Sequence, residues 1–487
     1  MLRGLAAEVG RVLGAASACP SIARPRIGAI TNRITAIIQS SGGEPDETAA
    51  IFELLNNSQS DGSRSVSARQ IDCAAIERQL ADLENISAPG APAAAPAAGP
   101  ARPIAFAGQA AAGAIRGVTA NEIVLGISAP LSGSAKDLGL QMQKGIETAF
   151  NSVNEDGGVN GRTLRLAAAD DGYEPTRTAE TVKDLYERER IFGFIGNVGT
   201  PTAVVSAPFA LEHRMLFFGA FTGADVLRRD PPDRYVFNYR ASYAEETAAA
   251  VNYLVKVRKI KTDQIAVFAQ QDSYGDAGFN GVMGAMRTLR GGDGGYVLRV
   301  GYARNSMDVD NAVAQLKAYK LPIRAIVMVS TYRAAAKFIE KTKDQYPGLV
   351  YTNVSFTGST ALKDELMLLG PQYAAGVIVT QVVPALDGYS SLVLQYKSAL
   401  ERYYPGEAAN YVSFEGYVSA QIMIEAIKRA GPNLNTEKVV DALENMQGFD
   451  LGLGALINYG RSEHQGSHKV WGTQLSESGK YEPIDLQ

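Results

Sequence analysis

Several short loops in this chain carry hydroxyl, amide and aromatic side chains directly after apolar runs, and such loops could bind a small molecule. The most informative stretch runs from Ile191 to Gly223. Its first apolar run stops at Gly196, an amphipathic segment follows at 202–211, and a second apolar run at 215–218 ends in another loop. Two buried parallel strands joined by a helix place both loops where open α/β sheets bind ligands.

The first of these loops also leads into the start of a helix, where free N–H groups and partial positive charge suit an anion. We therefore expect the loops to hold a carboxylate. Any single aromatic residue among the candidates could equally belong to the core, and it is their shared position at strand ends that favours a site. The candidate ligand-binding residues are Leu131, Ser132, Asn197, Gly199, Thr200, Phe221, Thr222, Tyr274, Tyr332, Ser355 and Phe356.

The chain offers little for catalysis. It has no Gly-x-Ser-x-Gly elbow, no phosphate-binding loop and no Gly-x-Gly-x-x-Gly fingerprint, so we predict neither an enzyme nor a cofactor. His464 and His468 have a spacing that binds zinc on a helix, but Gly466 between them indicates a turn, and we predict no metal site. Asp170 and Asp171 read as a solvated strand end that caps the next turn.

Composition sets the broad class of the protein. The 487 residues are 46% hydrophobic and 20% charged, with a formal net charge of −4. The length allows about three domains. The absence of a basic stripe argues against nucleic acid as a partner. No apolar run is long enough to be a transmembrane helix.

From Thr119 onward, short apolar runs alternate with helical patterns, which predicts parallel, doubly wound sheets. The expected strands are 123–128, 164–168, 192–195, 215–218, 235–239, 265–268, 296–302, 325–329, 354–357 and 376–381. The expected helices are 138–154, 176–188, 202–211, 245–257, 280–290, 309–318, 331–341, 390–403, 413–430 and 439–445.

This order predicts two α/β lobes, because the alternation restarts after Tyr239. The chain is expected to cross between the lobes near Tyr239, Val382 and Phe449 and so to form a three-crossing hinge around a cleft. The expected lobes are 119–239 with 382–445, and 240–381 with 446–487.

The first 118 residues differ in character. Residues 1–87 are predicted to be a small all-α segment, with helices at 27–38, 45–55 and 67–83, and residues 88–118 a Pro/Ala/Gly linker. Cys19 and Cys73 are compatible with one disulfide in an oxidising compartment or with two free buried thiols. The run before Cys19 resembles the end of a signal or a degenerate lipobox, although Glu8 and Arg11 interrupt it.

Five sequence segments resemble the branched-chain amino-acid-binding family of type I periplasmic binding proteins, which serve ABC importers. They are GISAPLSGSAKDLG (126–139), VNEDGGVNGRTLRL (153–166), ADDGYEP (169–175), FIGNVGTPTA (194–203) and DSYG (272–275). The resemblance implies two lobes that close on a ligand and then dock on a membrane permease.

The same resemblance implies roles for individual residues. The loops at 197–200 and 221–222 would hold the ligand carboxylate, Tyr274 would lie across the cleft, and Tyr332 would contribute from the second lobe. In the family, a glutamate in the loop matching 354–359 usually meets the ligand's ammonium group, but here that loop has no acid. A carboxylate without an amine, an aromatic acid or an amide-like ligand therefore fits better than an ordinary α-amino acid, unless Asp272 or Asp364 substitutes for the glutamate.

We expect a periplasmic solute-binding protein that delivers an amino acid or another carboxylate-bearing compound to the permease subunits of an ABC importer and could be tethered to the membrane. The alternative is a ligand sensor, in which residues 1–87 dock on a signalling protein instead. Neighbouring genes for a permease and an ATPase, or for a membrane kinase or cyclase, would discriminate between the two.

Overall fold

A computed structural model describes residues 2–17, 19, 22, 30, 73, 76, 77, 79, 80 and 115–486. The chain forms two compact units, Met1–Ala107 and Gly108–Gln487. In the described part of the chain, no helix is both long and apolar enough to cross a bilayer.

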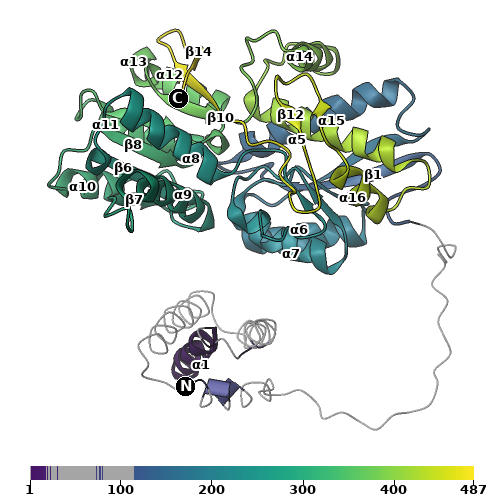
Figure 1. Ribbon diagram of the computed structural model, residues 1–487, viewed down its shortest axis with the longest axis horizontal. Coiled ribbons are helices and arrows are strands. Elements are labelled where there is room, and N and C mark those ends of the chain that lie inside the picture. Colours follow the sequence, from purple (N-terminus) through teal and green to yellow (C-terminus); the bar gives the residue numbers. More distant parts are fainter. Residues whose placement is uncertain are drawn as a thin grey trace. The chain divides into compact units, whose positions relative to one another are not determined.

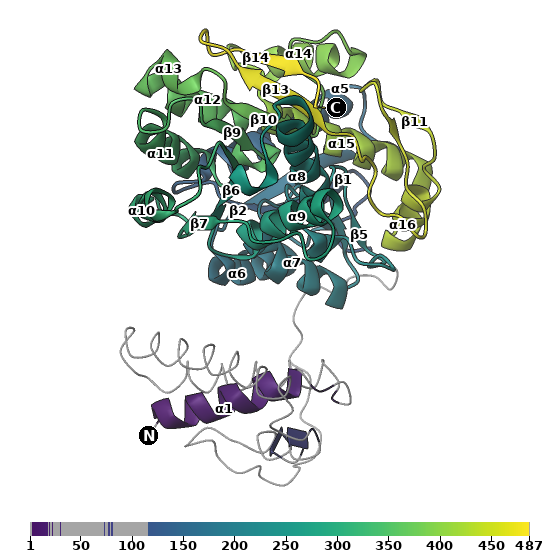
Figure 2. The same cartoon turned by 60° about the vertical axis from the view of Figure 1, so that its left-hand side comes forward.

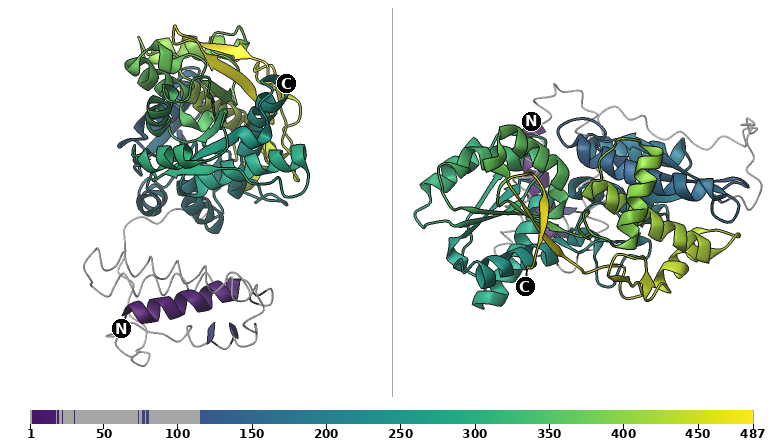
Figure 3. Two further views of the ribbon diagram at one scale, coloured as in Figure 1. Left: turned by 90° about the vertical axis from the view of Figure 1, so that its left-hand side faces the viewer. Right: turned by 90° about the horizontal axis from the view of Figure 1, so that it is seen from above.

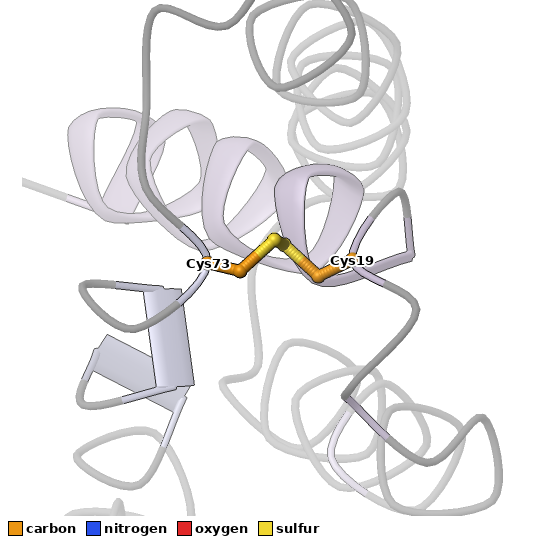
Figure 4. The surroundings of a disulfide bond; sticks show 2 residues. All are labelled: Cys19 and Cys73. Atoms are coloured by element: carbon orange, nitrogen blue, oxygen red, sulfur yellow. A yellow bond between two sulfur atoms is a disulfide. The ribbon is translucent and has the colours of Figure 1, made fainter.

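The first unit has a small core of its own. Helix α1 (Leu2–Ser17) buries Val9, Val12 and Leu13 in a cluster that also contains Ile76 and Leu80. Cys19 and Cys73 are joined by a disulfide bond (Figure 4). Of the two possibilities that the sequence left open, the structure therefore shows the disulfide and not two free thiols. The predicted helices at 27–38, 45–55 and 67–83 lie largely outside the described residues.

The second unit contains two lobes, each built on one sheet (Figure 1). The sheet of the first lobe has five parallel strands in the order β2-β1-β3-β4-β5. Its strands are β1 (Glu122–Ala129), β2 (Thr163–Asp170), β3 (Gly193–Ile195), β4 (Leu216–Phe218) and β5 (Val236–Phe237). Its helices are α5 (Lys136–Glu155), α6 (Pro175–Glu187), α7 (Thr200–Glu212), α14 (Ser391–Tyr403), α15 (Tyr411–Ala430) and α16 (Thr436–Glu444).

The sheet of the second lobe has seven strands in the order β14-β13-β10-β9-β8-β6-β7. The strands are β6 (Ile265–Gln270), β7 (Arg299–Tyr302), β8 (Ala325–Val329), β9 (Val350–Asn353), β10 (Ile378–Gln381), β13 (Trp471–Leu475) and β14 (Tyr481–Ile484). The helices are α8 (Tyr243–Asn252), α9 (Ser273–Arg290), α10 (Asp310–Ala318), α11 (Tyr332–Lys343), α12 (Ser359–Leu369) and α13 (Pro371–Ala374). Strands β13 and β14 are antiparallel additions to an otherwise parallel sheet (Figure 2).

Buried apolar strands explain these sheets. Every residue of β6 and β8 is buried, as expected for parallel strands covered by helices on both faces. In the first lobe, α5 and α15 pack so closely that a Cβ atom on Gly145 would lie 1.8 Å from the Ser413 carbonyl oxygen. The predicted class, two doubly wound α/β lobes, is confirmed.

The segments that cross between the lobes are bonded to one another. The Tyr239 hydroxyl donates to the Val382 carbonyl at 2.7 Å, and the Asn238 amide donates to the His464 carbonyl at 2.7 Å. The last crossing follows Gln465, later in the chain than the predicted crossing near Phe449. The reason is a hairpin of β11 (Phe449–Asp450) and β12 (Leu456–Ile457). This hairpin and the residues after it pack on the first lobe. Seen from above, the yellow C-terminal strands return to the second lobe (Figure 3, right).

Two local predictions are wrong. The strand expected at 354–357 is a 3₁₀ turn, η4 (Ser355–Thr357), and β9 lies just before it. Apolar Val354 and Phe356 alternate with Ser355 and Thr357, which is the pattern of a strand, but all four residues are buried in a turn. Tyr274 was expected in a loop, but it lies in the first turn of α9, whose N-cap is Asp272.

The disulfide should stabilise the first unit alone. Closing a loop between cysteines 54 residues apart is worth about 4 kcal/mol in the chain-entropy account. We expect the double variant Cys19→Ser/Cys73→Ser to lower the unfolding temperature of the first unit by several degrees and to leave that of the second unit unchanged. Calorimetry that resolves both transitions checks this, and an equal shift in both would contradict it.

Candidate functional site between the lobes

The loops that follow β3 and β4 meet through two threonine hydroxyls. The Oγ1 atoms of Thr200 and Thr222 lie 2.7 Å apart, and both side chains are buried. Thr200 is the first residue of α7, and no side chain caps the N–H groups of that first turn. Gly199 has φ of +107°, and a Cβ atom there would lie 2.3 Å from Cε2 of Tyr173, so the approach to the helix requires glycine.

Other polar groups near these hydroxyls lack partners. Asn197 accepts a hydrogen bond from the Ser128 amide at 3.4 Å, but its Nδ2 is buried and donates to no group among the described residues. The Tyr243 hydroxyl is likewise buried without a hydrogen bond in that part of the chain. Burial raises the pKa of Tyr243 to about 12, although the nearby guanidinium of Arg240 lowers it. Unsatisfied donors around a helix N-terminus favour an anionic ligand.

Aromatic rings from both lobes meet beside the threonines. The ring of Phe356, from the second lobe, has its centroid 4.6 Å from that of Tyr274 and 5.1 Å from that of Phe221 in the first lobe. Tyr173 of the first lobe lies 6.1 Å from Phe356. We call the group formed by Thr200, Phe221, Thr222, Tyr274 and Phe356 the interlobe site.

A buried arginine forms one wall of this site. Arg240, in the first crossing segment, is fully buried, and its guanidinium carbon lies 4.8 Å from the centroid of the Phe221 ring. Its Nη2 pairs with Glu246 at 3.1 Å and donates to the Ser355 hydroxyl. Its Nε and Nη1 make no hydrogen bond to the described residues, and the nearest acid to Nη1 is Glu415 at 3.6 Å.

Glu246, on α8, is fully engaged. Besides Arg240, it accepts from the Ser355 amide at 2.7 Å, from the Ser355 hydroxyl at 3.0 Å and from the Thr380 hydroxyl at 2.5 Å. These four donors occupy both oxygens of the carboxylate. Glu246 therefore has no free oxygen directed at a ligand cation.

Glu415, on α15, is also buried, but its surroundings differ from those of Glu246. Burial raises the pKa of Glu415 to about 7, and the adjacent Arg240 lowers it less than burial raises it, while Glu246 raises it further. This residue is the one charged side chain between Tyr411 and Ile424 in the sequence.

Polar contacts around the edge of the interlobe site also join the lobes. Arg304 pairs with Glu174 at 2.9 Å, and Asn305 donates to the same carboxylate at 2.6 Å. The Tyr332 hydroxyl donates to Asp137 at 2.6 Å. We call these three contacts the rim contacts.

The structure brings most predicted ligand-binding residues together, with three exceptions. Ser132 donates to Asp170 at 2.6 Å, and the Leu131 amide donates to the same carboxylate at 2.9 Å. Burial opposes the ionisation of Asp170, but these bonds and others lower its pKa to about 2. The Tyr332 hydroxyl is engaged in its rim contact with Asp137.

Asp171, which was expected at a solvated strand end, is buried instead, and the Ser128 hydroxyl donates to it at 2.8 Å.

Sequence analysis missed five residues of this region: Tyr173, Arg240, Tyr243, Glu246 and Glu415. The available signal was a charged residue within an apolar stretch, as at Arg240 between Tyr239 and Ala241. Such a signal marks a buried charge but does not say which distant residue will face it.

A cavity of about 640 Å³ is lined in part by Tyr243. Gly223, Arg228, Ala277 and Asn280 also contribute to its lining.

The two C-terminal histidines stabilise the hinge region. His464 stacks on Phe237 at 3.7 Å, and His468 lies 2.7 Å from Glu245. No group of metal-binding side chains occurs among the described residues.

The sequence pattern of one family, described as periplasmic binding protein, matches residues 122–480. The chain belongs to the periplasmic binding protein family. The resemblance inferred from the sequence is thus confirmed, and the chain is a binding protein, not an enzyme. Membership also carries the extracytoplasmic location expected for this class.

Individual relatives agree with this assignment. The crystal structure of a possible leucine/isoleucine/valine-binding protein from Rhodopirellula baltica has 36% sequence identity and a TM-score of 0.72, covering 77% of this chain and 98% of that one. An amino acid binding protein of Pseudomonas aeruginosa is 23% identical over 64% of this chain and 80% of its own length. A branched chain amino acid ABC transporter protein of Thermus thermophilus with bound valine shares the fold, with 20% identity, a TM-score of 0.65 and coverage of 75% and 95%.

The pKa of Glu415 should make the stability of this periplasmic binding protein depend on pH. A carboxyl group whose pKa is raised by folding stabilises the protein below its unfolded pKa, near 4.3, and this stabilisation is lost as the pH rises through the folded value of about 7. Relative to Glu415→Gln, the wild type should lose up to about 1.4 kcal/mol of unfolding free energy per pH unit between these values.

Urea unfolding at pH 5, 6, 7 and 8 measures this difference. Glu425→Gln is the matched control, because Glu425 lies on the same helix in an ion pair with Arg429 at the surface. Parallel pH profiles for the wild type and Glu415→Gln would show that Glu415 titrates alike in the folded and unfolded chains.

Proposed function

We propose that this chain is the solute-binding component of an ABC importer and that its ligand is an organic carboxylate without an adjacent ammonium group. The names of its relatives, which include leucine/isoleucine/valine-binding and amino acid binding proteins, support a small solute that bears a carboxylate. On this proposal, the permease subunits of the importer are its protein partners.

The carboxylate end of the ligand is assigned to the first lobe. Thr200 and Thr222 offer hydroxyls, Asn197 and Tyr243 offer donors without a partner in the described chain, and the first turn of α7 offers free N–H groups. Hydrogen bonds to a charged group are about twice as strong as those between neutral groups, so this set discriminates in favour of an anion.

The observation that carries the proposal is the state of Glu246. The family resemblance implies a glutamate in the loop matching 354–359, but this chain presents Ser355 and Phe356 there and no acid. The nearby Glu246 is already engaged with Arg240, Ser355 and Thr380. The second lobe therefore offers no uncommitted acid in this position, and a buried ammonium without a partner costs several kcal/mol.

A panel of matched acids and amino acids tests the ligand class. We expect 4-methylpentanoate and 3-phenylpropanoate to bind at least about a hundredfold more tightly than leucine and phenylalanine, because several kcal/mol corresponds to more than two orders of magnitude in affinity. Isothermal titration calorimetry with the full chain at pH 6 measures this. Equal or tighter binding of the amino acids would refute the proposed ligand class.

Removing one hydroxyl from the threonine pair should weaken binding of the acids. Thr200→Val and Thr222→Val keep the side-chain shape but lose a hydrogen bond to a charged group, worth about 1.5–3 kcal/mol, so we expect at least tenfold weaker binding. Thr342→Val, at an equally buried threonine of α11, is the control and should bind normally. If both site variants keep wild-type affinity while folded, the carboxylate binds elsewhere.

A further inference from the structure

Glu415 is the acid of the interlobe region whose charge is least compensated. Its carboxylate accepts no hydrogen bond from the described residues, and its one ion pair there is the 3.6 Å approach to Nη1 of Arg240. The same arginine is closer to Glu246, at 3.1 Å, and Glu246 has three further donors. Arg240 and Glu246 thus balance each other, and an ionised Glu415 would share the positive charge of Arg240 with Glu246 and have Arg228 as a weaker second cation.

The groups that face Glu415 come from several elements. Arg240 and Tyr239 belong to the first crossing segment, Glu246 lies on α8, and Arg228 follows η1 (Asp225–Leu227). The guanidinium of Arg228 donates to the carbonyl oxygens of Ala224 and Arg240 and to the side chain of Gln465. These acceptors are neutral, so Arg228 keeps its charge and lowers the pKa of Glu415, but less than Arg240 does. Arg240 is therefore the cation that acts most strongly on Glu415, and its charge is already shared with Glu246.

The backbone that carries Glu415 is held close to α5. The neighbouring Gly416 packs against α5 so tightly that a Cβ atom there would lie 2.5 Å from the Met142 carbonyl oxygen. Arg240, which faces Glu415, stacks over the Phe221 ring of the interlobe site at 4.8 Å. A ligand carboxylate held by Thr200 and Thr222 would thus share its low-dielectric surroundings with Glu415.

We propose that Glu415 is a specificity-determining residue of the interlobe site, and that it carries a proton when an anionic ligand is bound. This inference rests on the proposed carboxylate ligand. Two buried carboxylates that share one partly neutralised arginine repel each other, so the bound anion favours the protonated form of Glu415. Binding of one carboxylate to the ionised form of Glu415 is then coupled to the uptake of one proton from solvent onto a Glu415 oxygen.

A site in which Glu415 binds a ligand ammonium group predicts the opposite dependence of affinity on pH. If ionised Glu415 accepted the ammonium group of an amino acid, affinity would rise with pH as Glu415 loses its proton. The sign of the pH dependence therefore distinguishes a site selective for anions from one selective for zwitterions.

The experiment measures the affinity of 4-methylpentanoate and 3-phenylpropanoate for the full chain at pH 6 and pH 8. Both probes are ionised throughout this range, because ordinary carboxyl groups titrate near pH 4. With Glu415 titrating near pH 7, we expect about tenfold weaker binding at pH 8 than at pH 6. Calorimetry at pH 7 in two buffers of different ionisation enthalpy should show net proton uptake on binding, a readout that needs no variant.

Glu415→Gln should bind both probes with the same affinity at pH 6 and pH 8, close to that of the wild type at pH 6. The control Glu425→Gln should keep the wild-type pH dependence. A purely structural role for Glu415 would lower affinity at both pH values alike and leave the pH dependence in place.

The outcomes separate this inference from the proposed function. If the acids bind the wild type equally at both pH values, or without proton uptake, the role of Glu415 is wrong and the carboxylate ligand stands. If leucine or phenylalanine binds instead and more tightly at pH 8, or if no member of the panel binds, both proposals fail.

Discussion

The buried positive charge of Arg240 is the constraint around which the two lobes are arranged. A guanidinium removed from water is very unfavourable unless acids and hydrogen-bond acceptors surround it. Here the partners come from both sides: Glu246 and Ser355 belong to the second lobe, and Glu415 belongs to the first. Because the arginine lies in a crossing segment, its pairing is possible only in an arrangement that brings the lobes together, and the aromatic rings of the interlobe site pack beside it.

The crossing segments are held by a second arginine. Arg228 donates to the carbonyl oxygen of Arg240 at 2.9 Å and to the side chain of Gln465 at 2.6 Å, so it joins the first and third crossings. Glu245 lies on the same side, where it accepts from Gln465 at 2.9 Å and pairs with His468. The hinge is thus polar, and its backbone carbonyls accept hydrogen bonds from the long cationic side chain of Arg228. Rotation of the lobes must preserve these hydrogen bonds or exchange them for bonds to water.

The sequence was sufficient to predict the architecture because strands and helices have local patterns. The apolar run at 325–329 predicts β8, and the face of Met142, Ile146 and Phe150 predicts α5, without knowledge of the rest of the chain. The loops of the site were predictable because they end such runs. The buried charges were not, because Arg240 and Glu415 are far apart in the sequence and neither has a pattern that identifies the other. The 3₁₀ turn at 355–357 was not predictable either, since a buried turn with alternating apolar and polar residues has the same sequence pattern as a short strand.

The rim contacts have a consequence for how strongly any solute is retained. The bonds from Arg304 and Asn305 to Glu174 and from Tyr332 to Asp137 are made by the protein alone. They favour the closed form before a solute contributes anything, and the apparent affinity of a two-state receptor depends on how often its binding-competent form is populated. Residues that never touch the solute can therefore tune the balance between capture and release, and variation at this edge could adapt one binding site to habitats in which the solute is scarce or abundant.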